Sequence, residues 1–508
     1  MKEWKKPFNK ISKDTLIYVP AFLIPAFINV FSLVVFTRIF EAGDYGEYSL
    51  VLATTTFLAI LQSEWITQSV QRYLPQNNTD EEKRSFYSYL RFLIVSLTSA
   101  FMIVSIAMYP LIKPLLKGFT VFYWPAVVLI VFQMLFALSG GIFQSELKSK
   151  EFSIYRILNV SLRLLVSLGW IYFYGKEIIG LIWGAVITFG LILIPMLKKC
   201  SLLDQSGFSF RRQKAAYKRY FLQFIAYGFP MMGWYIGTSI LDISDRYLLK
   251  HLGSSEDVGI YSANYNLISA SLGLVTAPLL TASQPVIMKM VNKVVDDLDK
   301  IKNVITHLSR IYLLAVLPFI AYVTVFREEI TFLLLGKEYR EGAVIIPILL
   351  IAFSLWNFSM YGQIGHMIKE KTPIMVGFVF IAAAVNILLN FVLIPLYGYR
   401  GAALSTLFSF MLYPLFIYYS SRKFIPWKLK WDSFMRTLII STFTGISVSQ
   451  LKGLFLVNIH PFIGLIIGFC IGLIMYITLL FAVKELNQKE IQLLKGFVLH
   501  GKKSNKTE

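Results

Sequence analysis

The chain is poor in the residues on which soluble enzymes depend. Only 15% of its 508 residues are charged, against about a quarter in soluble proteins. The two cysteines, Cys200 and Cys470, and the five scattered histidines have no disulfide or metal-ligand spacing. The chain lacks a Walker A pattern, a nucleophile paired with a base, and a loop long enough for a catalytic domain. We therefore expect no enzyme activity, no catalytic residue, no metal site and no cofactor.

Long apolar runs take the place of these features. The chain is 56% hydrophobic, and its apolar residues fall in runs of about 20, the length of a helix that spans a bilayer. Lipid offers no hydrogen bonds to a backbone, so each run should be helical. The sequence predicts an all-α integral membrane protein with about fourteen transmembrane helices. The predicted spans are 15–39, 46–71, 86–112, 120–145, 152–174, 178–198, 219–245, 258–287, 304–326, 342–366, 373–396, 400–421, 434–456 and 461–483.

The positive charge follows the predicted membrane topology. The net charge is +20, and most of the 49 Lys and Arg residues lie in alternate loops such as "MKEWKKPFNKISK" and "SRKFIPWKLK". The intervening loops are short, for example "YGKE" and "YGYR". This is the positive-inside pattern, so both termini are expected in the cytoplasm and no nucleic-acid partner is needed to explain the charge. The first span lacks a signal-peptide cleavage site, and we expect it to be retained.

Two stretches about 220 residues apart have the same plan. They are "WIYFYGKEIIGLIWGAVITFG" at 170–190 and "NFVLIPLYGYRGAALSTLFSF" at 390–410. In each, an apolar span ends in Tyr-Gly, at Gly175 and Gly398, before a short charged turn and a second span. We expect each glycine to end its helix in a left-handed cap within an outer hairpin.

A second pair of similar stretches has nearly the same spacing. "DYGEYSLV" begins at residue 44 and "DVGIYSAN" at residue 257. Six spans is an even number, so the sequence predicts two six-helix lobes related by a parallel internal repeat, with two further C-terminal helices. The expected lobes are 1–200 and 214–425, followed by two transmembrane helices and a cytoplasmic tail in 426–508.

Three motifs carry a resemblance to a known family. The stretches "DYGEYSLV", "DRYLLKHLGSSEDVGIYSANYNL" and "NFVLIPLYGYRGAALST" resemble Wzx-type polysaccharide or O-antigen flippases, of the multidrug/oligosaccharidyl-lipid/polysaccharide exporter superfamily. The resemblance implies two lobes that open to one side of the membrane at a time. It also implies a bacterial cytoplasmic membrane protein that moves an undecaprenyl-diphosphate-linked oligosaccharide from the inner to the outer leaflet. Glycosyltransferases and a polymerase would then be its partners in surface polysaccharide biosynthesis.

Candidate cargo-binding residues lie first on the span 152–174. Arg156, Asn159 and Arg163 are spaced by three or four residues, so they share one helix face. Charged groups within spans are costly and indicate function. Arginine suits a diphosphate because its planar guanidinium makes two parallel hydrogen bonds. The alternative is that Arg163 pairs with a carboxylate such as Glu64 and joins two helices.

Further candidates lie on two other spans. Trp234 and Asp242 on one span and Glu64 on another suit a sugar, which needs polar groups at its rim and a flat apolar surface beneath its ring. The alternative is that these groups bond neighbouring helices. Asp242, Asp245 and Arg246 could also form a local salt bridge or an outer gate.

Two other transporter functions stay open at this point. A multidrug exporter of the same superfamily would recognise cations through acidic groups, and Glu64 is the residue that fits it best. The basic face around Arg163 and the lack of a carboxylate between Asp14 and Glu41 favour an anionic cargo instead. A flippase for lipid II or a teichoic-acid precursor would need the same diphosphate-binding chemistry.

Overall fold

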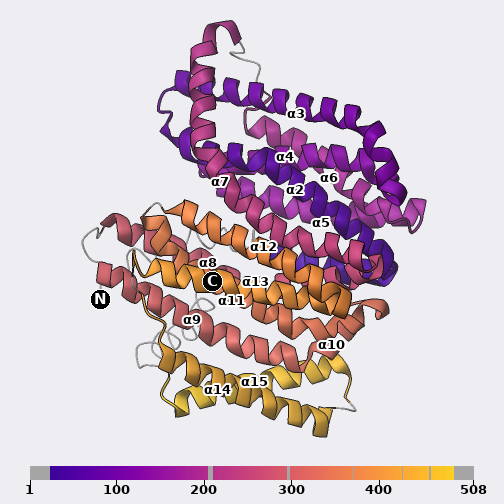
Figure 1. Cartoon of the computed structure of the whole chain (residues 1–508), viewed down its shortest axis with the longest axis vertical. Coiled ribbons are helices and arrows are strands. Elements are labelled where there is room, and N and C mark those ends of the chain that lie inside the picture. Colours follow the sequence, from indigo (N-terminus) through magenta and orange to yellow (C-terminus); the bar gives the residue numbers. More distant parts are fainter. Residues whose placement is uncertain are drawn as a thin grey trace, which may run out of the picture. The chain divides into compact units, whose positions relative to one another are not determined.

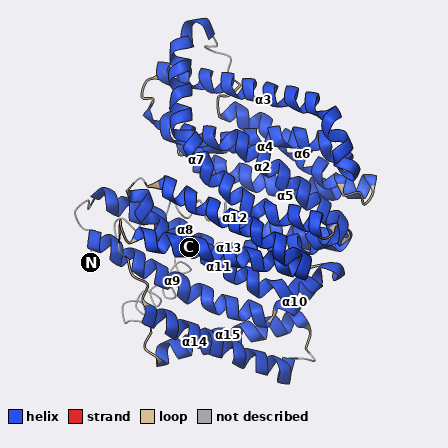
Figure 2. Ribbon diagram, in the orientation of Figure 1, coloured by secondary structure: helices blue, strands red, loops and turns tan. Residues whose placement is uncertain are grey.

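Helices make up all the regular secondary structure of the residues that the computed structural model describes (Figures 1 and 2). These residues are 23–203, 210–293, 298–369, 371–425, 427–456 and 459–485. The predicted cytoplasmic tail beyond 485 lies outside them. After a first helix, Leu23–Ile39, the elements are α2 (Ala42–Tyr73), η1 (Leu74–Gln76), α3 (Asp80–Leu116), η2 (Lys117–Phe122), α4 (Tyr123–Ser145), α5 (Ser149–Tyr174), α6 (Ile179–Lys199), α7 (Phe210–Leu252), α8 (Ser255–Lys293), α9 (Leu298–Val325), α10 (Arg327–Leu334), η3 (Lys337–Ile345), α11 (Ile346–Ile368), α12 (Thr372–Tyr397), α13 (Tyr399–Ser421), α14 (Trp431–Leu451), η4 (Lys452–Leu456) and α15 (Pro461–Ala482).

Every predicted span is helical over its described residues. Eleven helices in the described part of the chain are long and apolar enough to cross a membrane, and Leu23–Ile39 is a shorter apolar helix. The remaining two predicted spans lie within the long helices α7 and α8. The prediction of an all-α membrane protein with about fourteen transmembrane helices is therefore confirmed.

The chain divides into two compact units. Unit 1 comprises residues 1–278 and 334–424, and unit 2 comprises 279–333 and 425–508. Unit 1 thus holds the first helix, α2–α7, most of α8, and η3 with α11–α13. Unit 2 holds α9, α10, α14 and α15. The lobe boundaries predicted from the sequence stay a prediction.

Helix α7 links the two halves of unit 1. It packs along α2 and also along α12, while α11 and α12 both pack along α13. The first half of α7 contributes Tyr217, Tyr220 and Phe224 to an aromatic core shared with α2, α3 and α4. The approach to α2 is close, because a Cβ at Gly228 would lie 2.0 Å from the carbonyl oxygen of Trp65. This packing places the polar residues of α7 against those of α2.

The two Tyr-Gly stretches have equivalent structures. Helices α5 and α12 each end at the tyrosine, and the following Gly175 and Gly398 have φ of 98° and 57°. Each glycine N–H donates to a carbonyl four residues earlier, in Ile171 and Ile394. The positive φ was predicted. The ψ values of 177° and −137° are extended, so these caps occupy a region open to glycine rather than the left-handed helical region.

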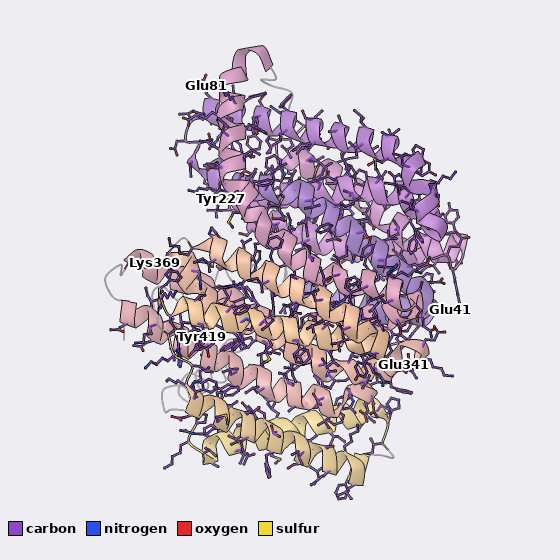
Figure 3. All side chains as sticks on the ribbon, in the orientation of Figure 1. Glu41, Glu81, Tyr227, Glu341, Lys369 and Tyr419 are labelled. Atoms are coloured by element: carbon purple, nitrogen blue, oxygen red, sulfur yellow. The ribbon has the colours of Figure 1, made fainter. Side chains whose placement is uncertain are left out.

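The ends of the unit 1 helices agree with the predicted alternation of loops. Figure 3 places Glu41 and Glu341 at one end of these helices and Lys369 and Tyr419 at the other. Glu41 and Glu341 lie in segments that the charge pattern predicts to be outside, and Lys369 lies in a basic loop predicted to be inside. We call these two ends the predicted outer and inner ends.

Unit 2 is held together by tight helix packing and a buried ion pair. A Cβ at Gly468 of α15 would lie 2.2 Å from the ring of Phe326, and a Cβ at Gly445 of α14 would lie 3.2 Å from Ala321. Arg310 Nε of α9 donates to Glu485 Oε1 over 3.0 Å, and both side chains are almost wholly buried. The two C-terminal helices are therefore anchored to α9 by both shape and charge.

Candidate functional site

Arg163 carries a positive charge within α5 that no acidic side chain of the described chain neutralises. The side chain is half-buried, and its Nη2 donates to Asn29 Oδ1 of the first helix over 3.1 Å. No ion pair joins Arg163 to a carboxylate in the described part of the chain. A guanidinium has five N–H donors, and a single neutral acceptor uses few of them. Donors therefore remain for an anionic ligand.

The proposed partnership of Arg163 with Glu64 is absent among the described residues. Glu64 instead accepts from Gln68 Nε2 over 3.3 Å, and Gln68 Nε2 also donates to Tyr235 Oη of α7 over 2.9 Å. Glu64 is half-buried at the packing between α2 and α7. The structure thus connects the acidic group of α2 to α7 through amide and hydroxyl groups, and it leaves Arg163 with Asn29.

The other predicted residues of α5 have different surroundings. Arg156 is half-buried, with its guanidinium carbon 5.9 Å from the centre of the Phe152 ring. Asn159 is 7% exposed, and its side-chain nitrogen has no hydrogen-bond partner among the described residues. An unsatisfied buried amide is costly. The face that carries Arg163 therefore also offers an unused neutral donor one helical turn away.

The end of the same face serves packing. Ser167 and Trp170 lie against α6, where a Cβ at Gly184 would be 2.3 Å from Ser167 Oγ and one at Gly180 would be 2.2 Å from the Trp170 ring. Trp170 also stacks on Trp183 at 6.3 Å. The polar stripe of α5 is therefore a candidate binding surface only along its Arg156–Arg163 part.

Trp234 belongs to an aromatic cluster in the second half of unit 1. Its ring centre lies 6.2 Å from that of Trp356 of α11 and 5.7 Å from that of Tyr413 of α13. Tyr413 is wholly buried, whereas both tryptophans are half-buried. Trp356 lies about 140° around α11 from the exposed Ile351, so the two residues are on different faces of that helix. Sequence reasoning missed Trp356, because an apolar span gives no sign of which tryptophan has an exposed ring.

Asp242 is exposed, and its carboxylate accepts a hydrogen bond from a tyrosine of α8. Its Oδ1 accepts from the hydroxyl of Tyr265 over 2.5 Å. Arg246 does not pair with this carboxylate, since its Nη1 donates to the backbone oxygen of Asp242 and its Nε donates to Ser262 Oγ. The predicted salt bridge among Asp242, Asp245 and Arg246 is thus replaced by hydrogen bonds to neutral groups in the described chain.

Asp245 is the centre of a buried network that joins four helices. It is 1% exposed and accepts from Tyr261 Oη at 2.5 Å, Asn390 Nδ2 at 2.6 Å and Thr406 Oγ1 at 2.6 Å. The partners come from α8, α12 and α13. Asn386 extends the network through Asn390. Two asparagines four residues apart in the apolar stretch before Pro395 were the sequence signal for it, and their partner could not be read from the sequence.

A protein-family comparison identifies the chain. Residues 11–291, more than half of the sequence, match the family described as "Polysaccharide biosynthesis protein". The chain belongs to this family. The predicted relationship to polysaccharide flippases is thereby confirmed at the level of the family. A comparison with proteins of curated description found no match.

Solved structures with the same fold are transporters. One titled "Lipid II flippase MurJ, inward closed conformation" has a TM-score of 0.74 and 14% identity over 92% of this chain and 98% of that chain. An inward-facing multidrug resistance MATE family transporter of the MOP superfamily has a TM-score of 0.61 and 13% identity over 80% and 94%. An outward-facing structure of such a transporter has a TM-score of 0.56 and 13% identity over 82% and 96%. At these identities the likeness establishes the fold. Family and fold together support a multi-pass membrane transporter.

Proposed function

We propose that this member of the polysaccharide biosynthesis family is a flippase for a lipid-linked oligosaccharide. Its cargo is a sugar chain on undecaprenyl diphosphate, moved from the inner to the outer leaflet of a bacterial cytoplasmic membrane by alternating access. The single observation that carries the proposal is Arg163, a half-buried charge within a span whose one hydrogen bond among the described residues goes to Asn29. An intramembrane cation without an acidic partner is costly unless an anion meets it.

In this proposal α5 binds the diphosphate. Arg163 supplies charge-assisted hydrogen bonds, Arg156 lies nearer the predicted inner end, and Asn159 adds a neutral donor between them. The polyprenyl tail stays in lipid while the polar group passes through the protein. The protein acts as a transporter and forms no covalent bond with its cargo.

The sugar contacts residues of both repeats. Trp234 and Trp356 present partly exposed rings on which a pyranose can stack, and Asp242 and Glu64 accept hydrogen bonds from its hydroxyl groups. In these roles the charged head of the cargo lies against α5 and its neutral sugars lie against α2, α7 and α11. The lobe limits, the cytoplasmic position of both termini, and partner glycosyltransferases and polymerase belong to the same proposal.

A multidrug exporter is the second candidate, and the exposed carboxylate of Asp242 is the observation that favours it. A flippase for lipid II or a teichoic-acid precursor differs from the first proposal only in the sugar. The three candidates therefore separate by cargo rather than by fold.

Depletion of the protein followed by mass spectrometry of polyprenyl-linked lipids tests the proposal. We expect a complete oligosaccharide-diphosphate lipid to accumulate while surface polysaccharide is lost. Accumulated lipid II would support the cell-wall precursor flippase. An unchanged lipid pool together with increased sensitivity to cationic drugs would contradict the proposal and support the exporter.

A further inference from the structure

The repeated "DYGEYSLV" and "DVGIYSAN" motifs begin two equivalent helices. Helix α2 starts at Ala42 and α8 at Ser255, and each motif places a glycine, Gly46 or Gly259, at the fifth residue of its helix. Neither glycine has a positive φ, so neither is required by a turn. The reason for glycine at these two positions must therefore lie in what surrounds them.

The two glycines lie in one reciprocal contact. A Cβ at Gly46 would be 2.1 Å from the carbonyl oxygen of Ser255 and 2.9 Å from the backbone nitrogen of Gly259. A Cβ at Gly259 would be 1.8 Å from the carbonyl oxygen of Ala42. Each glycine thus contacts the first residue of the other motif's helix, as a two-fold relation between the repeats requires. Backbone atoms cannot rotate away, so any side chain at either position forces the helix ends apart.

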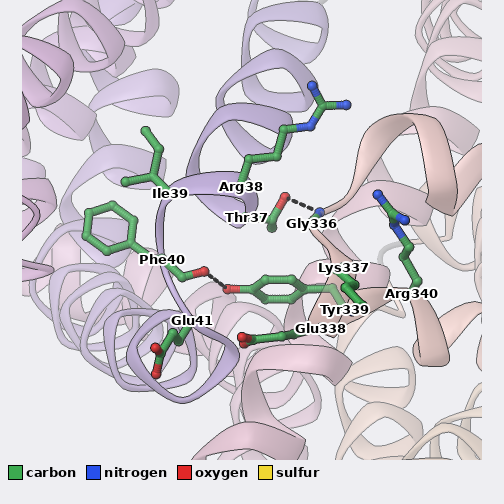
Figure 4. Close-up of a pocket in the computed structure, with 10 residues that line it drawn as sticks. All are labelled: Thr37, Arg38, Ile39, Phe40, Glu41, Gly336, Lys337, Glu338, Tyr339 and Arg340. Atoms are coloured by element: carbon green, nitrogen blue, oxygen red, sulfur yellow. Dashed lines mark hydrogen bonds between the residues drawn. The ribbon is translucent and has the colours of Figure 1, made fainter.

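Three hydrogen bonds close the same end of unit 1. Figure 4 shows two of them, from the hydroxyl of Tyr339 to the backbone oxygen of Phe40 at 2.9 Å and from the N–H of Gly336 to Thr37 Oγ1 at 3.2 Å. The third runs from the N–H of Ala42 to a carboxylate oxygen of Glu338 at 2.8 Å. A pocket of about 350 Å³ lies between these segments, lined by residues 37–41 and 336–340.

We propose that the Gly46–Gly259 contact and these three hydrogen bonds, together the outer clasp, are the outer gate of the transporter. The inference rests on the proposed alternating access, in which this end must open to release cargo. The clasp joins segments of the first repeat to segments of the second and lies at the predicted outer end. Its closed form depends on the absence of a side chain at both glycines. A methyl group at either position therefore shifts the population toward the outward-open form.

The test measures access from outside to a cysteine beneath the clasp. Cys200 and Cys470 are replaced by serine, and Thr238→Cys is introduced. Thr238 is half-buried, about 21 Å along α7 from Leu252 at its predicted outer end. Intact cells that make the full chain are treated with a membrane-impermeant maleimide. Gly46→Ala and Gly259→Ala are each expected to raise the labelling rate at least about tenfold.

Gly43→Ala is the matched control. Gly43 lies in the first turn of the same helix, and a Cβ there meets nothing within 4 Å. Its labelling rate should equal that of the parent. Rates in the two clasp variants that match the Gly43→Ala rate, in protein of normal abundance and melting temperature, would overturn the proposal.

A second variant keeps the test decisive if the alanine substitutions prevent folding. Tyr339→Phe removes one hydroxyl group and adds no atom, so it weakens the clasp without a clash. It is expected to raise labelling several-fold, and a rate equal to that of the parent would contradict the gate.

Labelling requires no cargo, so failure of the gate and failure of the proposed cargo can be told apart. Faster labelling in the clasp variants supports the gate whatever the cargo is. Unchanged labelling in a chain that still moves lipid-linked oligosaccharide refutes the gate and leaves the function standing.

Discussion

Arg163 and Asp245 are both ionisable residues within membrane-spanning helices, and the structure treats them in opposite ways. Asp245 is 1% exposed and accepts hydrogen bonds from three side chains on three other helices. Arg163 is half-buried and donates to one amide oxygen, with no acidic partner in the described chain. The protein itself supplies hydrogen bonds to the carboxylate of Asp245, whereas several N–H donors of the Arg163 guanidinium have no acceptor among the described residues. A charged side chain within a membrane span therefore indicates a ligand only where the protein does not supply its hydrogen-bond or ion-pair partners.

Unit 2 offers a third case. Glu485 is buried and receives Arg310 Nε at 3.0 Å and Arg436 Nη1 at 3.2 Å, and Ser433 also contacts it. Like Asp245, Glu485 has its partners within the protein, but here two of those partners are arginines. The comparison thus predicts that Glu485 and Asp245 govern stability and that Arg163 governs transport.

The largest expected effect is on the unfolding of unit 2. Glu485→Ala leaves the buried Arg310 without its carboxylate, and breaking a buried pair in this way costs about 3–5 kcal/mol. Thermal unfolding of the purified protein in detergent measures the loss. Asp432→Ala, which removes an exposed carboxylate from the first turn of α14, is the control and should change stability by less than about 0.5 kcal/mol. Equal melting temperatures for the two variants would contradict an internal role for Glu485.

A smaller loss of stability is expected from Asp245→Ala. The substitution removes the acceptor that Tyr261, Asn390 and Thr406 share. These groups keep further contacts with one another, with Asn386 and with the backbone oxygen of Ala402, so the total loss should be about 1–3 kcal/mol. Asp245→Asn keeps one acceptor oxygen and should unfold at a higher temperature than the alanine variant. If both variants had the melting temperature of the parent, the network would contribute nothing to stability, and the claim that Asp245 serves the fold would be wrong.

Arg163→Ala tests whether the unused hydrogen-bond donors of this guanidinium bind the cargo. Charge-assisted hydrogen bonds contribute about 1.5–3 kcal/mol, so transport should fall by roughly 10- to 150-fold. Arg163→Lys, which keeps the charge and loses the planar fork, should retain an intermediate rate. Recovery of surface polysaccharide in depleted cells gives the rates, and the melting temperature should stay near that of the parent. Full activity in both variants would remove Arg163 from the binding site.

The smallest expected effect concerns a thiol that the protein shields. Burial raises the pKa of Cys200 to about 12, and its sulfur lies 3.6 Å from the backbone oxygen of Ser139. Because a raised pKa lowers the thiolate fraction at neutral pH, a Cys470→Ser variant should react slowly with N-ethylmaleimide. The rate should rise by about tenfold for each pH unit between about 7 and 9, far below the pKa. A rate that levels off in this range would show that the thiol is ionised and accessible.

Hydropathy and charge predicted the fold because lipid imposes strong local rules. Each apolar run is helical over its described residues, and the glycines at 175 and 398 end α5 and α12 with positive φ as expected. The extended ψ of these caps was missed, because it depends on the path of the following helix. The similarity of the two motifs could also be read from local sequence, because each motif lies at the start of a helix and has its glycine at the fifth helical residue.

The surroundings of the candidate residues were less predictable. The sequence left pairing of Arg163 with Glu64 open as an alternative, yet Glu64 contacts Gln68 and Arg163 contacts Asn29. The partners of Asp245 lie up to 161 residues away in the sequence, and their meeting depends on how α7, α8, α12 and α13 pack. Spacing along one helix therefore gives the face on which a residue lies, while packing decides what that face meets.

Reconstitution tests the central claim most directly. The purified protein is placed in proteoliposomes that contain the oligosaccharide-diphosphate lipid accumulated by depleted cells, and a membrane-impermeant lectin measures the sugar exposed outside over time. The account predicts protein-dependent exposure of the sugar beyond the fraction accessible at the start, lost in the Arg163→Ala variant and partly kept in Arg163→Lys. Exposure that is the same with and without the protein would contradict the claim that this chain moves lipid-linked oligosaccharide.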